Sequence, residues 1–273
     1  VPVSVSVAMH GDSTARARGA RHDGFGAISG GGSTSRLLAD YPEPQRSQVL
    51  DYLFKPGFGA ALQVLKVEIG SDTESTDGSE PSHQHSRAEL PNFQRGWEWW
   101  MMREAKRRNP SIRLGALAWG APGWLGTPAN SPRVDSCVNF TCVEAMHPCN
   151  CNAYSKDVAG SPVGCVWNAT FAPYCPFFSR ETARYLVSWL QGAKTKHGLE
   201  FDFIGLWNER QFTTAFTVMF REELDAAGFH NVRLVATDNG ACCNLTERFL
   251  GDYRASAELR KAVDIIGMHY PSG

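Results

Sequence analysis

Short, almost entirely apolar segments alternate with longer amphipathic segments along most of this chain. This alternation limits the possible folds more than any other feature. Strands covered by helices on both faces are nearly all apolar, whereas half-exposed strands alternate apolar with polar residues. The amphipathic segments have the periodicity of helices that bury one face. The pattern therefore predicts an α/β fold with a parallel sheet, either a (β/α)8 barrel or a doubly wound sheet.

The predicted elements follow one another in βα order. Strands are expected at 24–30, 61–70, 112–119, 201–209, 231–238 and 264–270. Helices are expected at 42–54, 93–110, 179–198, 212–228 and 258–263. The helix at 179–198 has the clearest boundaries, because Ser179 is a typical N-cap and Gly198 a typical stop. Its expected buried face consists of Ala183, Leu186, Val187 and Leu190.

Two observations favour the barrel over the doubly wound sheet. No predicted strand is followed by G-x-G-x-x-G or a Walker loop, and we interpret SGGGSTS (29–35) as a simple glycine-rich turn. The chemically useful residues also fall at strand ends, where a barrel places its active site. These residues are Glu68, Trp119, Asn208, Glu209, Asp238 and His269. We therefore predict an incomplete (β/α)8 TIM barrel with about six of the eight βα units at 24–273, after a poorly ordered lead-in at 1–23.

Charge and hydropathy exclude several classes of partner. The chain has 27 basic and 28 acidic side chains, so its net charge of -1 provides no field for nucleic acid or an anionic membrane. No apolar run approaches the roughly 20 residues of a membrane-spanning helix. We therefore expect neither a nucleic-acid partner nor a transmembrane segment, and no motif calls for a cofactor.

Cysteine usage indicates the cellular compartment. Six of the eight cysteines fall within 127–178, and none forms the C-x-x-C pairs of a zinc site. We therefore interpret this segment as a disulfide-rich insertion, with all 15 pairings of six cysteines left open. Three acceptor sequons, at Asn139, Asn168 and Asn244, agree with a glycoprotein of the secretory pathway.

Several of the polar candidates have a structural explanation. Asp202 and Asp264 precede their strands and should lie at the opposite, structural end of the sheet. For Glu68 the leading interpretation is a salt bridge with a neighbouring base such as Lys66. His269 is as well explained by a hydrogen-bonded wall residue as by a substrate contact.

A structural role also explains most of the aromatic and histidine-rich segments. The tryptophans within 97–100 lie on a predicted helix and should pack in the core. Trp119 differs, because it ends a strand and offers an indole face on which a pyranose can stack. The HQH segment (83–85) lacks helical ligand spacing, so we expect a loop and no metal site.

Glu209 is the candidate that is hardest to explain structurally. It ends the buried run IGLWNE, and burying a carboxylate without a partner is costly. Retaining glycosidases use a carboxyl group that protonates the leaving oxygen and a second carboxylate that attacks the anomeric carbon. An Asn-Glu pair after the fourth strand of a βα series is typical of barrel glycosidases whose acid/base group lies there. We therefore predict Glu209 as the proton donor and Asn208 as a contact of the sugar 2-hydroxyl.

Longer motifs carry a family resemblance. The segment at 26–83 and the strings EWWMMREAKRRNP, PGWLG, DFIGLWNER and DIIGMHYP resemble the galactocerebrosidase (galactosylceramidase) family of lysosomal retaining β-galactosidases. The resemblance implies cleavage of galactosylceramide-type sphingolipids, a saposin that presents the lipid, and a lysosomal or secreted location. It assigns Glu209 as the acid/base group, with Thr76, Trp119, Asn208 and His269 as substrate contacts.

The chain also departs from the family pattern. The insertion at 127–178 replaces a shorter connection, and the chain stops at Gly273, after strand six. The nucleophile of the family lies on strand seven, so it is expected beyond Gly273, and we predict that this piece alone is inactive and poorly stable. Two alternatives stay open: another retaining glycosidase of this fold, such as a glucosylceramidase or endo-glycanase, and a carbohydrate-binding protein without catalysis.

Overall fold

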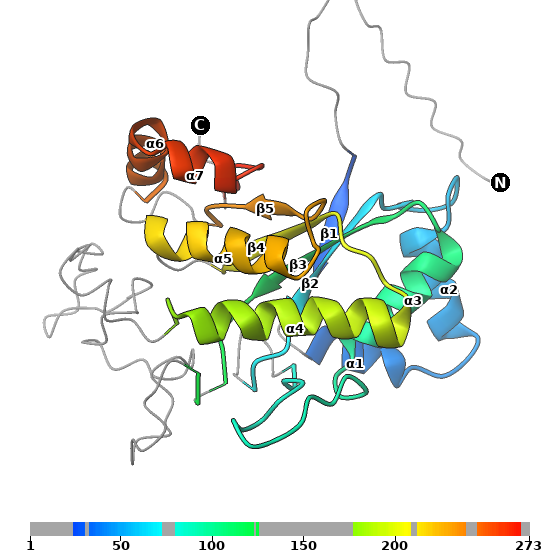
Figure 1. The fold of residues 1–273 in the computed structure, drawn as a ribbon. Coiled ribbons are helices and arrows are strands. Elements are labelled where there is room, and N and C mark those ends of the chain that lie inside the picture. The colour runs from blue at the N-terminus through cyan, green and yellow to red at the C-terminus, as the bar shows by residue number, and fades with distance from the viewer. Residues whose placement is uncertain are drawn as a thin grey trace, which may run out of the picture.

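The computed structural model describes residues 24–30, 33–72, 80–122, 124–125, 177–208, 212–238 and 245–268. Parallel strands alternate with helices in these ranges (Figure 1). The strands are β1 (Gly26–Ser29), β2 (Val64–Ile69), β3 (Arg113–Ala118), β4 (Phe203–Trp207) and β5 (Arg233–Val235). The helices are α1 (Ser33–Ala39), α2 (Gln45–Phe54), α3 (Glu98–Arg108), α4 (Arg180–His197), α5 (Thr214–Ala226), α6 (Leu245–Ala255) and α7 (Ala257–Ala262).

The sheet has the strand order β1-β2-β3-β4-β5, and every pairing is parallel. Each strand thus pairs with the next strand of the sequence. A doubly wound sheet reverses its strand order at a switch point, and the described strands contain no such reversal. The predicted α/β class with a parallel sheet is therefore confirmed, and the strands are wound in a single direction.

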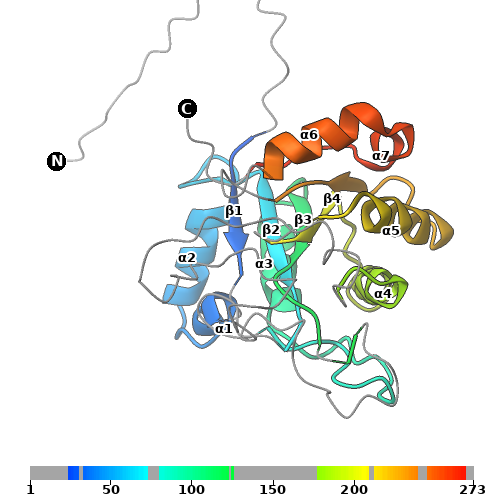
Figure 2. The same cartoon turned by 90° about the vertical axis from the view of Figure 1, so that its left-hand side faces the viewer.

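The helices surround the strands. Helix α4 packs against α5, α5 against α7, and α2 against α3. Figure 2 shows α1 and α2 on one side of the strands and α4 and α5 on the other. The buried core lies between these helices and the sheet and includes the fully buried Leu114 and Ala116 of β3. The helix layer leaves the carboxyl ends of the strands free to carry polar groups.

Helix α4 begins and ends where its sequence predicts. The Ser179 hydroxyl accepts a hydrogen bond from the Thr182 N–H at 3.2 Å, and Gly198 follows the helix with a φ of 63°. That left-handed conformation favours glycine because in any other residue the Cβ atom would come too close to the adjoining backbone carbonyl. The predicted apolar face, Ala183, Leu186, Val187 and Leu190, is buried.

The amino ends of the strands have a structural role, as predicted for Asp202 and Asp264. The Asp202 carboxylate accepts a hydrogen bond from the Leu114 N–H at 3.1 Å. The Asp264 carboxylate accepts one from the Leu234 N–H at 2.8 Å. Each aspartate thus binds the backbone of a strand beside the one that it precedes.

The predicted helix 93–110 starts later than expected. Gly96 has a φ of 105°, which interrupts a helix, so α3 starts at Glu98. Of the tryptophans predicted to pack in the core, Trp99 is buried and Trp100 packs against the core, whereas Trp97 is half-buried.

Two helices were not predicted. The glycine-rich turn expected at 29–35 is replaced in its second half by α1, and α6 occupies a stretch for which no helix was expected. Their neighbours in the fold stabilise them: α1 packs on α3 and α6 on α7.

Strand six was predicted at 264–270 and is shorter than expected. In the described part of the chain it forms an isolated parallel bridge between Val235 and Ile265. Backbone bonds still run beside β5, with the Ala236 N–H donating to the Ile265 carbonyl at 2.9 Å and the Gly267 N–H to the Ala236 carbonyl at 3.1 Å. The direction is therefore that of a sixth parallel strand.

Candidate functional site

The carboxyl ends of β3, β4 and β5 bring three of the predicted strand-end residues together. Trp119 and Asn208 directly follow β3 and β4, and Asp238 lies three residues beyond β5. With the Asn208 amide oriented to satisfy both neighbours, its nitrogen donates to Asp238 Oδ2 and its oxygen accepts from Trp119 Nε1, each at 3.1 Å. Asn208 is thus the centre of a polar chain across three strands.

Lys66 extends this chain to a fourth strand. Its Nζ lies 3.4 Å from both carboxylate oxygens of Asp238, and the two side chains are 27% and 13% exposed. Two strands separate β2 from β5 in the sheet. The contact therefore crosses the inner face of the sheet, which must curve to bring β2 and β5 together.

This ion pair corrects the expectation that Lys66 pairs with Glu68. The two residues lie on one face of β2, as strand alternation requires, but Lys66 turns to Asp238. The long Lys66 side chain reaches across the curved sheet to Asp238. The Glu68 side chain is shorter and is fully buried. Glu68 belongs instead to a buried group of carboxyl side chains.

Trp119 is fixed from several directions. Its carbonyl accepts a hydrogen bond from Trp207 Nε1 at 3.0 Å, and Lys66 Nζ lies 6.0 Å from its ring centroid. A Cβ atom at Gly30 would lie 3.0 Å from Cη2 of the indole, so the ring uses the space that glycine leaves. Trp119 is 5% exposed, and stacking of a sugar on its face stays a prediction.

Three glutamates are buried beside β1 and β2: Glu68 on β2, Glu80 in the loop after it, and Glu98 in the first turn of α3. Glu80 Oε1 accepts hydrogen bonds from the N–H groups of Trp97 at 2.7 Å and Glu98 at 3.1 Å. These bonds fix the start of α3.

Glu98 is held by hydroxyl groups in turn. Its Oε1 accepts hydrogen bonds from Ser29 at 2.8 Å and from Ser35 at 3.0 Å. Sequence reasoning singled out neither Glu80 nor Glu98. An acidic residue inside the aromatic run WEWW was the available signal for the latter.

Burial controls the protonation of these carboxyl groups. It raises the pKa of Glu80 to about 8 against the bonds from the Glu98 and Trp97 N–H groups, and Glu68 raises it further. Burial and the neighbouring Glu80 raise the pKa of Glu98 well above its ordinary value. Glu80 and Glu98 therefore favour their protonated forms at neutral and acid pH.

The HQH segment lies in the loop between β2 and α3, as predicted. The His83 ring is stacked between Phe93 and Tyr185, at centroid distances of 5.2 and 4.2 Å. Burial lowers the pKa of His83 to about 3, so the ring is neutral. His85 Nδ1 lies 2.8 Å from Asp72 Oδ2. Both histidines therefore anchor the loop.

The remaining predicted site residues, Glu209, His269 and Thr76, lie outside the described residues. Glu209 directly follows Asn208, and His269 directly follows the described segment that ends at residue 268. Thr76 lies in the segment between Asp72 and Glu80, which are joined by a backbone hydrogen bond of 3.2 Å. The lead-in at 1–23, the cysteines and the sequons at Asn139, Asn168 and Asn244 also lie outside the described part.

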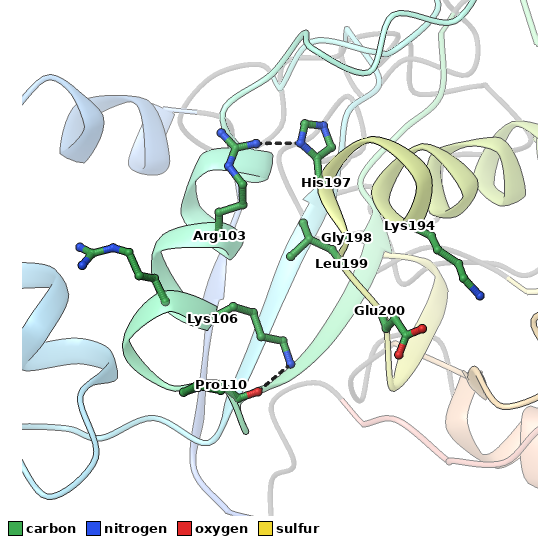
Figure 3. A pocket seen from close by; sticks show the side chains of 9 residues that line it. Arg103, Lys106, Pro110, Lys194, His197, Gly198, Leu199 and Glu200 are labelled. Carbon is green, nitrogen blue, oxygen red and sulfur yellow. Dashed lines mark hydrogen bonds between the residues drawn. The ribbon is translucent and has the colours of Figure 1, made fainter.

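A pocket of about 650 Å³ lies at the other end of the sheet, between the C-terminal ends of α3 and α4 (Figure 3). Two of its basic side chains, Arg103 and Lys106, bind neighbouring protein atoms. Arg103 Nη1 donates to His197 Nδ1 at 2.7 Å, and Lys106 Nζ donates to the carbonyls of Pro110 at 3.3 Å and Ile112 at 2.6 Å. Cations at helix C-terminal ends are favoured by the helix dipole, so this pocket has a structural explanation.

Comparisons with known proteins agree with a glycosidase fold. The profile of Glycosyl hydrolase family 59 matches residues 22–146 and 163–273. Galactocerebrosidase of Danio rerio is 43% identical over 256 residues, which make up 93% of this chain and 31% of that protein. Galactocerebrosidase of Homo sapiens is 43% identical over 253 residues, 93% of this chain and 30% of that protein. The chain thus spans about a third of the length of these relatives.

Solved structures with a similar fold are more distant in sequence. An endo-β1,6-glucanase has a TM-score of 0.59 at 17% identity, covering 92% of this chain and 52% of its own. The catalytic domain of the GH30 xylanase C from Talaromyces cellulolyticus has a TM-score of 0.54 at 18% identity, covering 91% of this chain and 53% of its own. At these identities the likeness shows the fold alone.

Proposed function

Because this chain belongs to glycosyl hydrolase family 59, we propose that it is part of the catalytic barrel of a retaining β-galactosidase. Its substrates would be galactosylceramide-type sphingolipids, cleaved by water to galactose and ceramide. The observation that carries this proposal is the 43% identity to galactocerebrosidases over 93% of the chain. The placement of Asn208 at the end of β4, directly before Glu209, supports it.

The proposed mechanism gives each residue one task. Glu209 protonates the glycosidic oxygen while a second carboxylate attacks the anomeric carbon, and Glu209 then deprotonates the water that releases galactose. Asn208 hydrogen-bonds the sugar 2-hydroxyl, and Trp119, Thr76 and His269 line the galactose site. The nucleophile is assigned to the part of the protein beyond Gly273.

The sheet edges support the proposal that further strands complete the barrel. Phe25 next to β1 and Ile28 within it are 73% and 50% exposed. Ile266 and Met268, beyond β5, are 45% and 53% exposed. Apolar side chains on both outer edges fit additional strands that pair with each edge. We therefore expect the isolated piece to be inactive and poorly stable.

The compartment and partners belong to the same proposal. Clustered cysteines in 127–178 and the three sequons support a disulfide-bonded glycoprotein that reaches the lysosome or is secreted. A glycosphingolipid is the substrate, and a saposin-type carrier would present it. No helix of the described residues is both long and apolar enough to cross a membrane.

A panel of aryl glycosides tests the substrate class in the full-length protein that contains this chain. We expect turnover of the β-galactoside with retention of configuration. Turnover of the β-glucoside without the β-galactoside would identify a different retaining glycosidase. Binding of galactose without any turnover would identify a carbohydrate-binding protein.

The acid role of Glu209 is tested by Glu209→Gln. The variant keeps the size of the side chain but has no proton for the leaving oxygen. Substrates with poor leaving groups should slow by about 10² to 10⁴, whereas activated aryl galactosides should slow far less. Equal slowing of both kinds of substrate would contradict proton donation by Glu209.

A further inference from the structure

We propose that Asp238, held in place by Lys66, is a positioning residue that decides which atoms of the Asn208 amide face the substrate. The inference rests on the proposed glycosidase function. Its basis is the hydrogen-bond chain that links Trp119, Asn208 and Asp238, beyond the ends of β3, β4 and β5, to Lys66 within β2.

The chemistry of the two neighbours leaves the Asn208 amide one orientation. A carboxylate accepts hydrogen bonds, and an indole N–H donates. The amide nitrogen must therefore face Asp238 Oδ2 and the amide oxygen must face Trp119 Nε1, at 3.1 Å each. A rotation of the amide by 180° would set an oxygen against a carboxylate and an NH2 group against an indole N–H. Asp238 and Trp119 together exclude that state.

Lys66 fixes Asp238 from across the inner face of the curved sheet. Asp238 follows β5 by three residues, and Lys66 extends from β2 to within 3.4 Å of both of its oxygens. The carboxylate is thus held between a cation on one strand and an amide on another. Because these side chains are 27% and 13% exposed, they are partly shielded from water, unlike an ordinary surface ion pair.

The fixed amide has a consequence for the sugar. One N–H of Asn208 binds Asp238, which leaves its second N–H to donate to a ligand. In the flipped state the amide oxygen would face the ligand in place of the N–H. The sugar 2-hydroxyl would then have to donate a hydrogen bond to Asn208, whereas it accepts one in the orientation that Asp238 imposes. Asp238 therefore acts on the substrate through Asn208, and its effect depends on the 2-hydroxyl that Asn208 contacts.

The variant Asp238→Asn tests this in the full-length protein. An asparagine can donate as well as accept, so it no longer dictates the orientation of Asn208. We expect kcat/KM for an aryl β-galactoside to fall about 10-fold to 100-fold, since small misplacements of a contact group have effects of this size. For the matching aryl 2-deoxy-β-galactoside, kcat/KM should change less than about threefold, because this substrate lacks the hydroxyl that contacts the Asn208 amide.

Two controls separate positioning from a general structural effect. Asp225→Asn removes a carboxylate on α5 that pairs with Arg221 at 2.6 Å, and both substrates should keep their rates. In an Asn208→Ala background, Asp238→Asn should have no further effect, because the residue through which it acts is gone. A further variant, Lys66→Met, should reduce the ratio of kcat/KM for the 2-hydroxyl substrate to that for the 2-deoxy substrate, to a value between those of the wild type and Asp238→Asn.

Equal losses for the 2-hydroxyl and 2-deoxy substrates, or additive losses with Asn208→Ala, would overturn the inference. If the proposed substrate class is wrong, a different result is expected. Galactosides and glucosides share the 2-hydroxyl configuration, so turnover of glucosides alone rejects the galactosidase and leaves the same comparison possible with glucosides. If nothing is hydrolysed, calorimetric binding of galactose and 2-deoxygalactose decides: Asp238→Asn must weaken the former selectively.

Discussion

Replacing Glu80 with glutamine should make the stability of the protein less dependent on pH. Glu80 is 2% exposed, and its pKa is raised from 4.5 to about 8, mainly by burial. The substituted glutamine would be neutral at every pH and would keep an oxygen that accepts from the N–H groups of Trp97 and Glu98. The variant Glu80→Gln therefore removes the titration while it preserves the bonds at the start of α3.

The direction of the pH dependence follows from the difference between the pKa of Glu80 in the folded and in the unfolded state. Between pH 4.5 and about 8 the unfolded chain has lost the Glu80 proton, whereas the folded protein keeps it. The stabilisation is complete below the unfolded pKa and is lost as the pH rises through this window. At 1.36 kcal/mol for each unit of pKa, the whole window corresponds to roughly 5 kcal/mol. An interval of about 2.5 pH units inside it corresponds to roughly 3 kcal/mol.

Urea unfolding of the full-length protein near pH 5 and near pH 7.5, followed by tryptophan fluorescence, measures this difference. From pH 5 to pH 7.5 the unfolding free energy of the wild type should fall by roughly 3 kcal/mol more than that of Glu80→Gln. Glu222→Gln is the matched control, because that side chain is 59% exposed and should leave the pH dependence unchanged. Parallel loss of stability in Glu80→Gln and the wild type would refute proton retention by Glu80.

Two further predictions concern Gly30 and Ser179. Gly30→Ala places a Cβ atom 3.0 Å from Cη2 of Trp119, so the indole must shift, and we expect kcat/KM for aryl galactosides to fall about tenfold with little change in unfolding free energy. Unchanged kinetics would show that the position of Trp119 is not critical. Ser179→Ala removes the hydroxyl that caps α4 and should reduce the unfolding free energy by about 1 kcal/mol, measured by urea unfolding. A Ser179→Gly variant should lose only a few tenths of a kcal/mol of unfolding free energy. Equal losses in Ser179→Ala and Ser179→Gly would argue against the cap.

The sequence by itself determined the elements that depend on near neighbours. The boundaries of α4 at Ser179 and Gly198 are set by a cap and a left-handed residue within one turn of the helix. The structural aspartates before β4 and near Ile265 were also predicted from their place relative to strands. Asn208 at the end of β4 followed from the apolar run that precedes it. Each signal spans only a few residues.

The tertiary structure alone decided which distant side chains meet. Lys66 pairs with Asp238, 172 residues away, because the curved sheet brings β2 opposite β5. The same curvature sets Asp238 against Asn208. Strand alternation predicts the face of a side chain but gives no distance across a sheet. The nearby carboxylate of Glu68 was therefore the natural expectation from sequence, and the partner beyond β5 was not.

Burial of the acidic group was likewise decided by the fold. Glu80 comes from a loop and Glu98 from the first turn of α3, and apart from the aromatic run around Glu98 their local sequence gives no sign of burial. Their raised pKa values arise because the helix start, β1 and β2 enclose them together. Local sequence thus determined where the strands and α4 lie, whereas the protonation of these acids and the orientation of Asn208 depend on atoms from several strands, which only the folded chain brings within hydrogen-bonding distance.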